Sequence, residues 1–305
     1  MMGDRRVVVT GGCGFIGSHL VESLVADGHA VIVVDDLSTG KSQNLDPAAR
    51  LIEADVADGD RIAEALNGAQ LCYHLAAVAS VARSVEAWRA SSLVNLIGSV
   101  TVFEACANAE VPVVYASSAA VYGRPETTPL KENSAVAPAS PYGADKLAAE
   151  LHARAGGLCR GLRSVGLRLF NVFGSRQDPA SPYSGVISQF ADRARRGADI
   201  EIHGGGGQTR DFIHVSDVVD AFRRAPAAAS VDAPVFNVAS GVETSIAHLA
   251  ALIVELAGSA SALRPAPARP GDIARSVGDA SALAAALDWT PKVSLSAGLE
   301  ALLRR

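Results

Sequence analysis

Residues 7–17 read Val-Val-Val-Thr-Gly-Gly-Cys-Gly-Phe-Ile-Gly. The β-branched start is typical of a buried strand, and a helix pattern begins at once over Phe15–Asp27. Gly11 allows a tight turn, Gly14 lets backbone N–H groups approach a pyrophosphate, and Gly17 lets the helix pack close to the strand. The helix N-terminus offers its free N–H groups and its dipole to phosphates. The stretch therefore predicts a strand–loop–helix unit that binds a dinucleotide.

The next apolar run, Ala30–Asp35, leads into the acidic pair Asp35 and Asp36. An acidic side chain at this point accepts hydrogen bonds from the ribose hydroxyls of the adenosine half and repels a 2′-phosphate. We therefore expect NAD, rather than NADP, as the cofactor. A glycine turn without a ligand is the alternative, and the strand before the loop, the helix after it and the acidic strand end all count against that reading.

Short β-branched runs alternate with helical patterns through the first two thirds of the chain. The predicted strands are Val7–Thr10, Ala30–Asp35, Leu71–His74, Val111–Ala116 and Gly166–Phe170. The predicted helices include Phe15–Asp27, Ser91–Ala109 and Tyr142–Gly156. Short apolar strands separated by helices form parallel sheets that are covered on both faces, with right-handed connections. The expected fold class is therefore α/β, with a doubly wound parallel (Rossmann) sheet.

The pattern loosens after Asn171, where we expect a smaller C-terminal lobe that binds the substrate. The glycine run at 204–207 predicts a tight connection between strands, rather than a phosphate cradle, because no helix pattern follows it directly. We expect residues 1–170 to form the NAD-binding domain, which also receives part of 208–240. Residues 171–305 then form mainly the second lobe.

Composition excludes several classes of partner. The 305 residues carry a formal net charge of −5 and no run of Lys or Arg, so neither nucleic acid nor an anionic membrane is expected. The cysteines Cys13, Cys72, Cys106 and Cys159 form no CxxC motif, which predicts reduced thiols and no metal site. The N-terminal apolar run is too short for a signal sequence, and no uninterrupted apolar stretch is long enough to span a bilayer. We therefore expect a cytoplasmic protein.

Tyr142 and Lys146 form the most reactive pattern in the sequence. If Tyr142 starts a helix, the i, i+4 spacing places both side chains on one face, where the lysine cation stabilises a phenolate and lowers the pKa of the tyrosine. Tyr142 can then accept a hydroxyl proton near neutral pH. Ser118, at the end of a predicted parallel strand, would hydrogen-bond the reacting oxygen and help to relay its proton.

The chain also resembles the extended short-chain dehydrogenase/reductase family and, within it, the UDP-sugar 4-epimerases. The motifs that carry the resemblance are TGGCGFIG, HLAA, SSAAVYG, YGADK, LFNVFG, QTRDFIHV and RPGDIARS, which together cover nearly the whole chain. The resemblance implies that Ser118, Tyr142 and Lys146 are the catalytic serine, tyrosine and lysine.

The same resemblance implies which residues line the two ligands. For NAD they are Gly11, Gly14, Phe15, Ile16, Gly17, Asp35, Asp36, Ser38, Thr39, Gly40, Asp55, Val56, Leu75, Ala76, Ala77, Asn95, Tyr142, Lys146 and Phe170. For a UDP-sugar substrate they are Ser80, Ser118, Asn171, Arg210, Arg269, Asp272 and Ser276. Arginines suit a diphosphate and an aspartate suits ribose hydroxyls.

The reaction implied is NAD-dependent 4-epimerisation of a UDP-hexose through a transient 4-keto sugar. In the dehydratases of the family an Asp-Glu pair follows the catalytic hydroxyl residue, and in the decarboxylases a Glu stands there. Here the two positions are Ala119 and Ala120, neither of which moves a proton. Those two reactions, a UDP-glucuronate 4-epimerase, a net dehydrogenase that releases NADH and a non-catalytic NAD-binding sensor remain as alternatives.

The identity of the sugar depends on a few positions. The family places either a bulky tyrosine or a small residue at Ser276, and a small residue leaves space for an N-acetyl group at carbon 2. Ser80 and Asp178 also resemble the branch that accepts UDP-N-acetylglucosamine, while ordinary variation in an enzyme for UDP-glucose is the alternative. Family members commonly form homodimers through two helices of each subunit, here Ser91–Ala109 and Tyr142–Gly156.

Overall fold

A computed structural model describes residues 5–177, 185–268 and 271–304. Its centre is a sheet of seven parallel strands in the order β10-β6-β5-β4-β1-β2-β3. The strands are β1 (Arg6–Thr10), β2 (Ala30–Asp35), β3 (Arg50–Glu53), β4 (Leu71–His74), β5 (Val113–Ser118), β6 (Ser164–Leu169) and β10 (Val235–Val238). The order reverses between β1 and β4, which is the arrangement of a doubly wound sheet.

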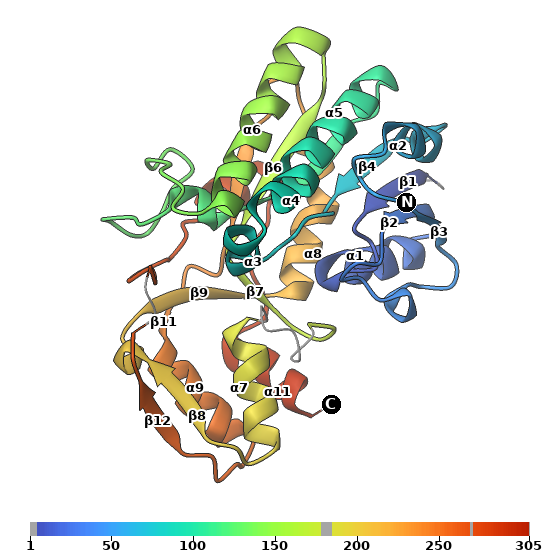
Figure 1. Ribbon diagram of the computed structural model, residues 1–305. Helices are drawn as coiled ribbons and strands as arrows, with labels where there is room; N and C mark the ends of the chain where they lie inside the picture. The colour runs from blue at the N-terminus through green and yellow to red at the C-terminus, as the bar shows by residue number, and fades with distance from the viewer. Residues whose placement is uncertain (1–4, 178–184, 269–270, 305) are drawn as a thin grey trace.

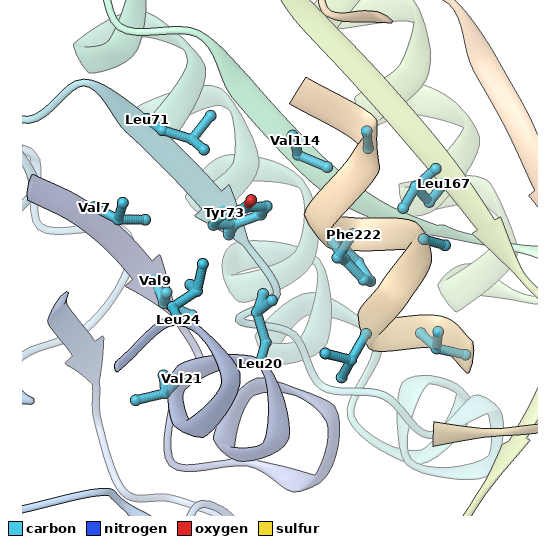
Figure 2. Packing of buried hydrophobic residues seen from close by; sticks show 14 of the residues in the cluster. Val7, Val9, Leu20, Val21, Leu24, Leu71, Tyr73, Val114, Leu167 and Phe222 are labelled. Carbon is cyan, nitrogen blue, oxygen red and sulfur yellow. The ribbon is translucent and has the colours of Figure 1, made fainter. Parts of the chain in front are cut away.

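Helices cover both faces of this sheet (Figure 1). One face packs against α1 (Phe15–Ala26) and α8 (Val215–Arg224), and Figure 2 shows Leu20 and Phe222 meeting Tyr73 there. The other face packs against α2 (Gly59–Leu66), α5 (Gly98–Asn108) and α6 (Pro141–Arg160). Adjacent strand residues alternate between the two cores, because successive side chains of a strand point to opposite faces. The predicted fold class is confirmed.

Several boundaries differ from the sequence-based predictions. The strand expected at Val111–Ala116 runs from Val113 to Ser118, so it carries both serines to its carboxyl end. The helix expected over Ser91–Ala109 begins earlier and is interrupted: α4 (Trp88–Ser92) passes through a π-helical turn, η2 (Leu93–Ile97), into α5. A π-helical turn inside a helix is rare and often lies at a functional site.

One helix bears on the expectation about membranes. The continuous helical stretch Trp88–Asn108 is long and apolar enough, by length and composition, to cross a bilayer. In the structure it packs against α2 and α6 beside the central sheet, where 39% of its most apolar window is buried. A helix at the edge of a soluble core passes the same test, so this one helix is weak evidence for a membrane span.

The rest of the chain builds a second lobe below the sheet (Figure 1). It contains the three-stranded sheet β11-β9-β7, formed by β7 (Asn171–Phe173), β9 (Thr209–His214) and β11 (Glu243–Ser245), and a strand pair, β8 (Ile200–His203) and β12 (Leu263–Ala266). The helices α7 (Val186–Arg195), α9 (Ile246–Leu256) and α11 (Leu295–Leu303) enclose its apolar core. The chain returns to the central sheet through α8 and β10 before α9 begins, and α10 (Ser281–Leu287) packs beside β10.

Candidate active site

The glycine loop between β1 and α1 is shaped by contacts that no larger residue permits. Gly11 has a φ of +70°, and a Cβ built on it would lie 2.6 Å from the backbone nitrogen of Ala76. A Cβ on Gly17 would lie 2.1 Å from the carbonyl oxygen of Gly11. The first turn of α1 therefore sits directly against the loop, and its free N–H groups face the edge of the sheet where phosphates would bind.

The two acidic residues after β2 have different surroundings. Asp35 is buried, and its carboxylate accepts hydrogen bonds from the backbone N–H groups of Cys13 (2.9 Å) and Leu37 (2.9 Å). Burial raises the pKa of Asp35, and those two hydrogen bonds lower it in part. Asp36 is exposed and accepts hydrogen bonds from the backbone and hydroxyl of Ser38 (3.0 and 2.7 Å). Of the two carboxylates, Asp35 is thus the one that contacts the glycine loop.

The remaining cofactor positions collect at one edge of the sheet. They follow the carboxyl ends of β1 to β4, which lie side by side, and they are Phe15, Ile16, Thr39, Gly40, Asp55, Val56, Leu75, Ala76 and Ala77. Ligands of open α/β sheets bind outside the carboxyl ends of the strands, at the point where the strand order reverses. The residues present therefore fit an NAD molecule laid across this edge. Phe170 is placed differently, because it packs in a small apolar core against Tyr122 and Gly278.

Asn95 lies in the π-helical turn and hydrogen-bonds to the backbone of the segment that follows β4. Its Oδ1 accepts from the N–H of Val78 (2.7 Å), and its Nδ2 donates to the carbonyl of the same residue (3.3 Å). The contact fixes the segment that follows Ala77. In the structure Asn95 therefore shapes the cofactor edge through the backbone of Val78.

A buried hydrogen-bonded chain, which the sequence did not reveal, supports the same edge. The N–H of Ala76 donates to Thr10 Oγ1 (3.3 Å), and Thr10 Oγ1 lies 2.7 Å from His74 Nδ1. On the other side His74 Nε2 lies 3.0 Å from Ser99 Oγ, whose hydroxyl donates to the carbonyl of Asn95 (2.5 Å). Because the Ser99 hydroxyl donates its proton to the Asn95 carbonyl, its oxygen must accept a hydrogen bond from His74 Nε2. His74 Nδ1 is then the acceptor, and it accepts from the Thr10 hydroxyl. Burial lowers the pKa of His74 to about 3, with a contribution from Lys146, so the ring stays neutral.

Ser118, Tyr142 and Lys146 come together where β5 ends and α6 begins. Tyr142 is the second residue of α6 and is partly exposed, while Lys146 is buried one turn later. Lys146 Nζ donates to the carbonyl of Ala116 (2.8 Å) and lies 5.9 Å from the centre of the Tyr142 ring. Ser118 Oγ accepts from the N–H of Ala120 (3.1 Å), which leaves its proton free for the hydrogen bond with Tyr142.

The expected lowering of the tyrosine pKa is not what the structure shows. Burial raises the pKa of Tyr142, and the hydrogen bond from Ser118 lowers it only in part. Burial also lowers the pKa of Lys146 to about 8, against the nearby charge of Asp145. The physical reason is that burial disfavours the charged form of each group, while the ammonium group donates a hydrogen bond to the Ala116 carbonyl and lies 5.9 Å from the centre of the ring.

The second lobe contributes a cavity of about 210 Å³. Its lining includes the predicted residues Asn171, Arg210 and Asp272, together with Gln189, Phe190, Arg193, His203 and Gln208, which the sequence did not single out. Arg210 forms an ion pair with Asp272 and donates to the carbonyls of Thr209 and Ile273 (2.7 Å each). A diphosphate would therefore meet a guanidinium already held in place, which is the arrangement that binds phosphate well.

The other predicted substrate residues are more scattered. Ser80 is the N-cap of α3 (Val81–Glu86), where its hydroxyl accepts from the N–H of Arg83 (3.1 Å). Ser276 is buried in the segment that leads to the bridge between Leu130 and Gly278. Arg269 and Asp178 lie outside the described residues.

Comparisons with known proteins agree with this arrangement. The sequence profile of the NAD dependent epimerase/dehydratase family matches residues 7–239. UDP-glucose 4-epimerase of Mycolicibacterium smegmatis is 40% identical over 307 aligned residues, which cover 96% of each protein. The crystal structure of UDP-glucose 4-epimerase from Thermotoga maritima with UDP-glucose has a TM-score of 0.93 at 35% identity, over 98% of this chain and 97% of that one.

A second solved structure is equally similar. It is UDP-N-acetylglucosamine 4-epimerase from Methanobrevibacter ruminantium in complex with UDP-N-acetylmuramic acid, with a TM-score of 0.93 at 37% identity, over 99% of this chain and 98% of that one. The profile match extends over most of the chain, and the relatives align over nearly their full length. This chain belongs to the NAD dependent epimerase/dehydratase family.

Proposed function

We propose that the protein is an NAD-dependent isomerase that inverts carbon 4 of a UDP-hexose, either UDP-glucose/UDP-galactose or UDP-N-acetylglucosamine/UDP-N-acetylgalactosamine. The observation that carries the proposal is the position of Ser118, Tyr142 and Lys146. They meet where β5 ends and α6 begins, at the carboxyl edge of the central sheet that also carries the glycine loop, and the second lobe adds a cavity that contains Arg210. Relatives that are 4-epimerases for both types of sugar support the same assignment.

The glycine loop and Asp35 would hold NAD, which when bound would supply a hydride acceptor and donor for sugar carbon 4. Tyr142 accepts the proton of the 4-hydroxyl and gives it back, with Ser118 hydrogen-bonded to the reacting oxygen. Lys146 provides a buried positive charge 5.9 Å from the centre of the phenol ring. Arg210 and its neighbours hold the nucleotide diphosphate, so the 4-keto sugar can turn within the site while it stays attached.

Ala119 and Ala120 favour 4-epimerisation over the dehydration and decarboxylation reactions of the family. They form the start of the short helix η3 (Ala119–Tyr122), directly after Ser118. Elimination of a 6-hydroxyl needs an acid and a base near carbon 5 and carbon 6, and neither methyl group transfers a proton. Dehydration and decarboxylation are therefore disfavoured, and the intact Ser118, Tyr142 and Lys146 argue against a non-catalytic sensor.

The proposal includes a homodimer in the cytoplasm. Leu93 and Ile97 in the π-helical turn and Leu151 and Leu158 on α6 are 45%, 47%, 61% and 75% exposed. Large apolar side chains on neighbouring helices are unusual on the surface of a monomer and typical of an interface. A second copy of the chain that covers α5 and α6 explains this exposure and the apolar composition of Trp88–Asn108 without a membrane.

The test is incubation of the purified protein with UDP-glucose, UDP-N-acetylglucosamine or UDP-glucuronate in separate reactions, followed by NMR of the sugar. We expect the 4-epimer of at least one of the first two, with little net change in NADH absorbance because the hydride returns. A steady rise in NADH indicates a net dehydrogenase instead. Loss of water or of CO₂ from the sugar indicates a dehydratase or a decarboxylase.

A further inference from the structure

The first turn of α6 carries Tyr142, so the groups that hold this turn decide where the phenol lies. The first N–H groups of a helix have no partner within the helix and must find one elsewhere. In α6 the N-cap Ser140 accepts from the N–H of Gly143 through its side chain (3.1 Å), and Pro141 has no N–H to satisfy. The backbone N–H of Tyr142 is the donor in this turn that still needs a partner from outside the helix.

That donor is satisfied by Ser84, 58 positions earlier in the chain. The N–H of Tyr142 donates to Ser84 Oγ (3.1 Å). The hydroxyl of Ser84 in turn donates to the carbonyl of Val81 within α3 (2.7 Å), so its lone pair is directed at Tyr142. Ser84 is completely buried, although Val81 and Val85 on the same short helix are 47% and 61% exposed. Ser84 therefore joins α3 to α6, the helix that carries Tyr142 and Lys146 (Figure 1).

The opposite side of the same turn rests on the segment that carries Ser118. A Cβ built on Gly143 would lie 2.6 Å from the carbonyl oxygen of Ala120, so α6 already approaches η3 as closely as a glycine permits. Ser118 is the N-cap of η3 and the hydrogen-bond partner of Tyr142. The turn is thus fixed between two supports, η3 on one side and the hydroxyl of Ser84 on the other.

We propose that Ser84 is a positioning residue for catalysis, which holds the backbone of Tyr142 so that its phenol stays in register with Ser118 and the substrate. The proposal rests on the epimerase function given above. Ser84 touches no reacting atom, and a loss of position at Tyr142 lowers the rate of the chemical step more than it weakens ligand binding. A misplacement of about 1 Å at a catalytic group can lower a rate by about a hundredfold.

The experiment compares the wild type with Ser84→Ala, Ser84→Cys and the control Ser140→Ala. Ala removes the hydroxyl, and Cys keeps nearly the same volume but is a poor acceptor. Ser140→Ala removes a hydrogen bond from the same helical turn without releasing Tyr142 from α3. We expect both Ser84 variants to lower kcat by about tenfold to a hundredfold, with KM for the UDP-sugar and the affinity for NAD changed less than threefold.

A double-mutant cycle separates positioning from general loss of structure. If Ser84 acts through the alignment of Tyr142 with Ser118, then Ser84→Ala has a smaller effect in the Ser118→Ala background than in the wild type. Wild-type kcat in both Ser84 variants overturns the proposal, as does an equal loss in Ser140→Ala. Inactivity of the wild type towards every UDP-sugar refutes the epimerase function itself, which is a separate outcome from an active wild type with unaffected Ser84 variants.

Discussion

Tyr142 carries the one proton transfer that the proposed reaction cannot do without. Tyr142→Phe removes the phenol oxygen and keeps the ring, so the packing of α6 and the NAD site should be preserved. We expect bound NAD in the variant and epimerisation slower by about 10²–10⁴-fold, the usual contribution of a general acid–base group. NMR of the UDP-sugar measures the rate and the absorbance of the denatured protein's extract measures NAD. A near-normal rate would refute the role given to Tyr142.

Lys146 should make stability depend on pH in a specific window. Burial lowers its pKa from 10.5 to about 8, so below pH 8 the folded protein carries the cost of a buried charge, about 3 kcal/mol at 1.36 kcal/mol per pKa unit. Between pH 8 and 10.5 the unfolded chain binds more protons than the folded one, so this cost is relieved as pH rises. Lys146→Met should therefore be more stable than the wild type at pH 7, by less than that amount because it loses the hydrogen bond to Ala116.

The measurement is urea unfolding of NAD-free protein from pH 7 to pH 10. The advantage of Lys146→Met over the wild type should shrink with rising pH, while Lys131→Met, at a 63% exposed lysine, should differ little from the wild type at any pH. An advantage that stays constant over the whole range would mean that Lys146 keeps its ordinary pKa.

Ser276 offers a test of the sugar. A tyrosine in its place fills the volume that we expect an N-acetyl group to occupy, so Ser276→Tyr should reduce turnover of UDP-N-acetylglucosamine more than that of UDP-glucose, by about 10–200-fold in relative kcat/KM. Parallel assays with the two sugars give the ratio directly. Equal losses on both would remove Ser276 as a determinant of specificity.

Residue-level prediction from the sequence succeeded where the chemistry is local. The glycine loop and the Tyr142–Lys146 pair are readable because their spacing lies within one loop or one helical turn, and the structure places both at the same sheet edge. The contacts of Ser84 and His74 could not be predicted, because their partners Tyr142 and Thr10 are 58 and 64 positions away in the sequence. The residues next to a serine or a histidine do not indicate such a distant contact. The pKa of Tyr142 differs from the prediction because burial, which a sequence does not display, raises it more than the hydrogen bond from Ser118 lowers it.

At the scale of elements, one buried ion pair ties α6 to the central sheet. Glu150, one turn after Lys146, receives two hydrogen bonds from Arg168 on β6 (2.9 and 2.7 Å) and one from Ser117 (2.5 Å). Arg168 also donates to Tyr122 Oη (2.9 Å). The helix that carries the catalytic pair is thereby joined to both strands beneath it.

Removal of one partner of this pair leaves an uncompensated buried charge. Glu150→Gln should therefore lower the free energy of unfolding by about 3–5 kcal/mol, and Glu150→Gln with Arg168→Met should recover part of that loss. Glu64→Gln, which weakens exposed ion pairs with Arg50 and Arg61, should cost less than about 1 kcal/mol. Urea unfolding measures all three, and a cost for Glu150→Gln no larger than that for Glu64→Gln would contradict the importance of the pair.

The elements that the sequence did not predict share a physical reason. β3 is only four residues long, lies at the edge of the sheet, and has just two apolar residues between Arg50 and Glu53. β10 carries the buried Asn237, whose amide donates to the carbonyls of Leu130 and Asp279 (3.0 and 3.2 Å). Polar residues at an edge or in a tertiary network interrupt the apolar run by which a parallel strand is recognised.

At the scale of the whole molecule, the exposed apolar residues of α6 give the homodimer a direct test. Leu151 and Leu158 are seven positions apart and so lie on one face of α6, a helix that packs against α5 (Figure 1). Arginine at both positions should convert the dimer to a monomer in analytical ultracentrifugation, because two buried charges without partners oppose association by several kcal/mol. Leu263→Arg, at a 40% exposed leucine of β12 in the second lobe, is the matched control and should remain dimeric. Since each subunit has its own glycine loop, Tyr142 and Arg210, the monomer should still bind NAD. A wild type that sediments as a monomer, or a double variant that stays dimeric, would mean that this face is not the interface.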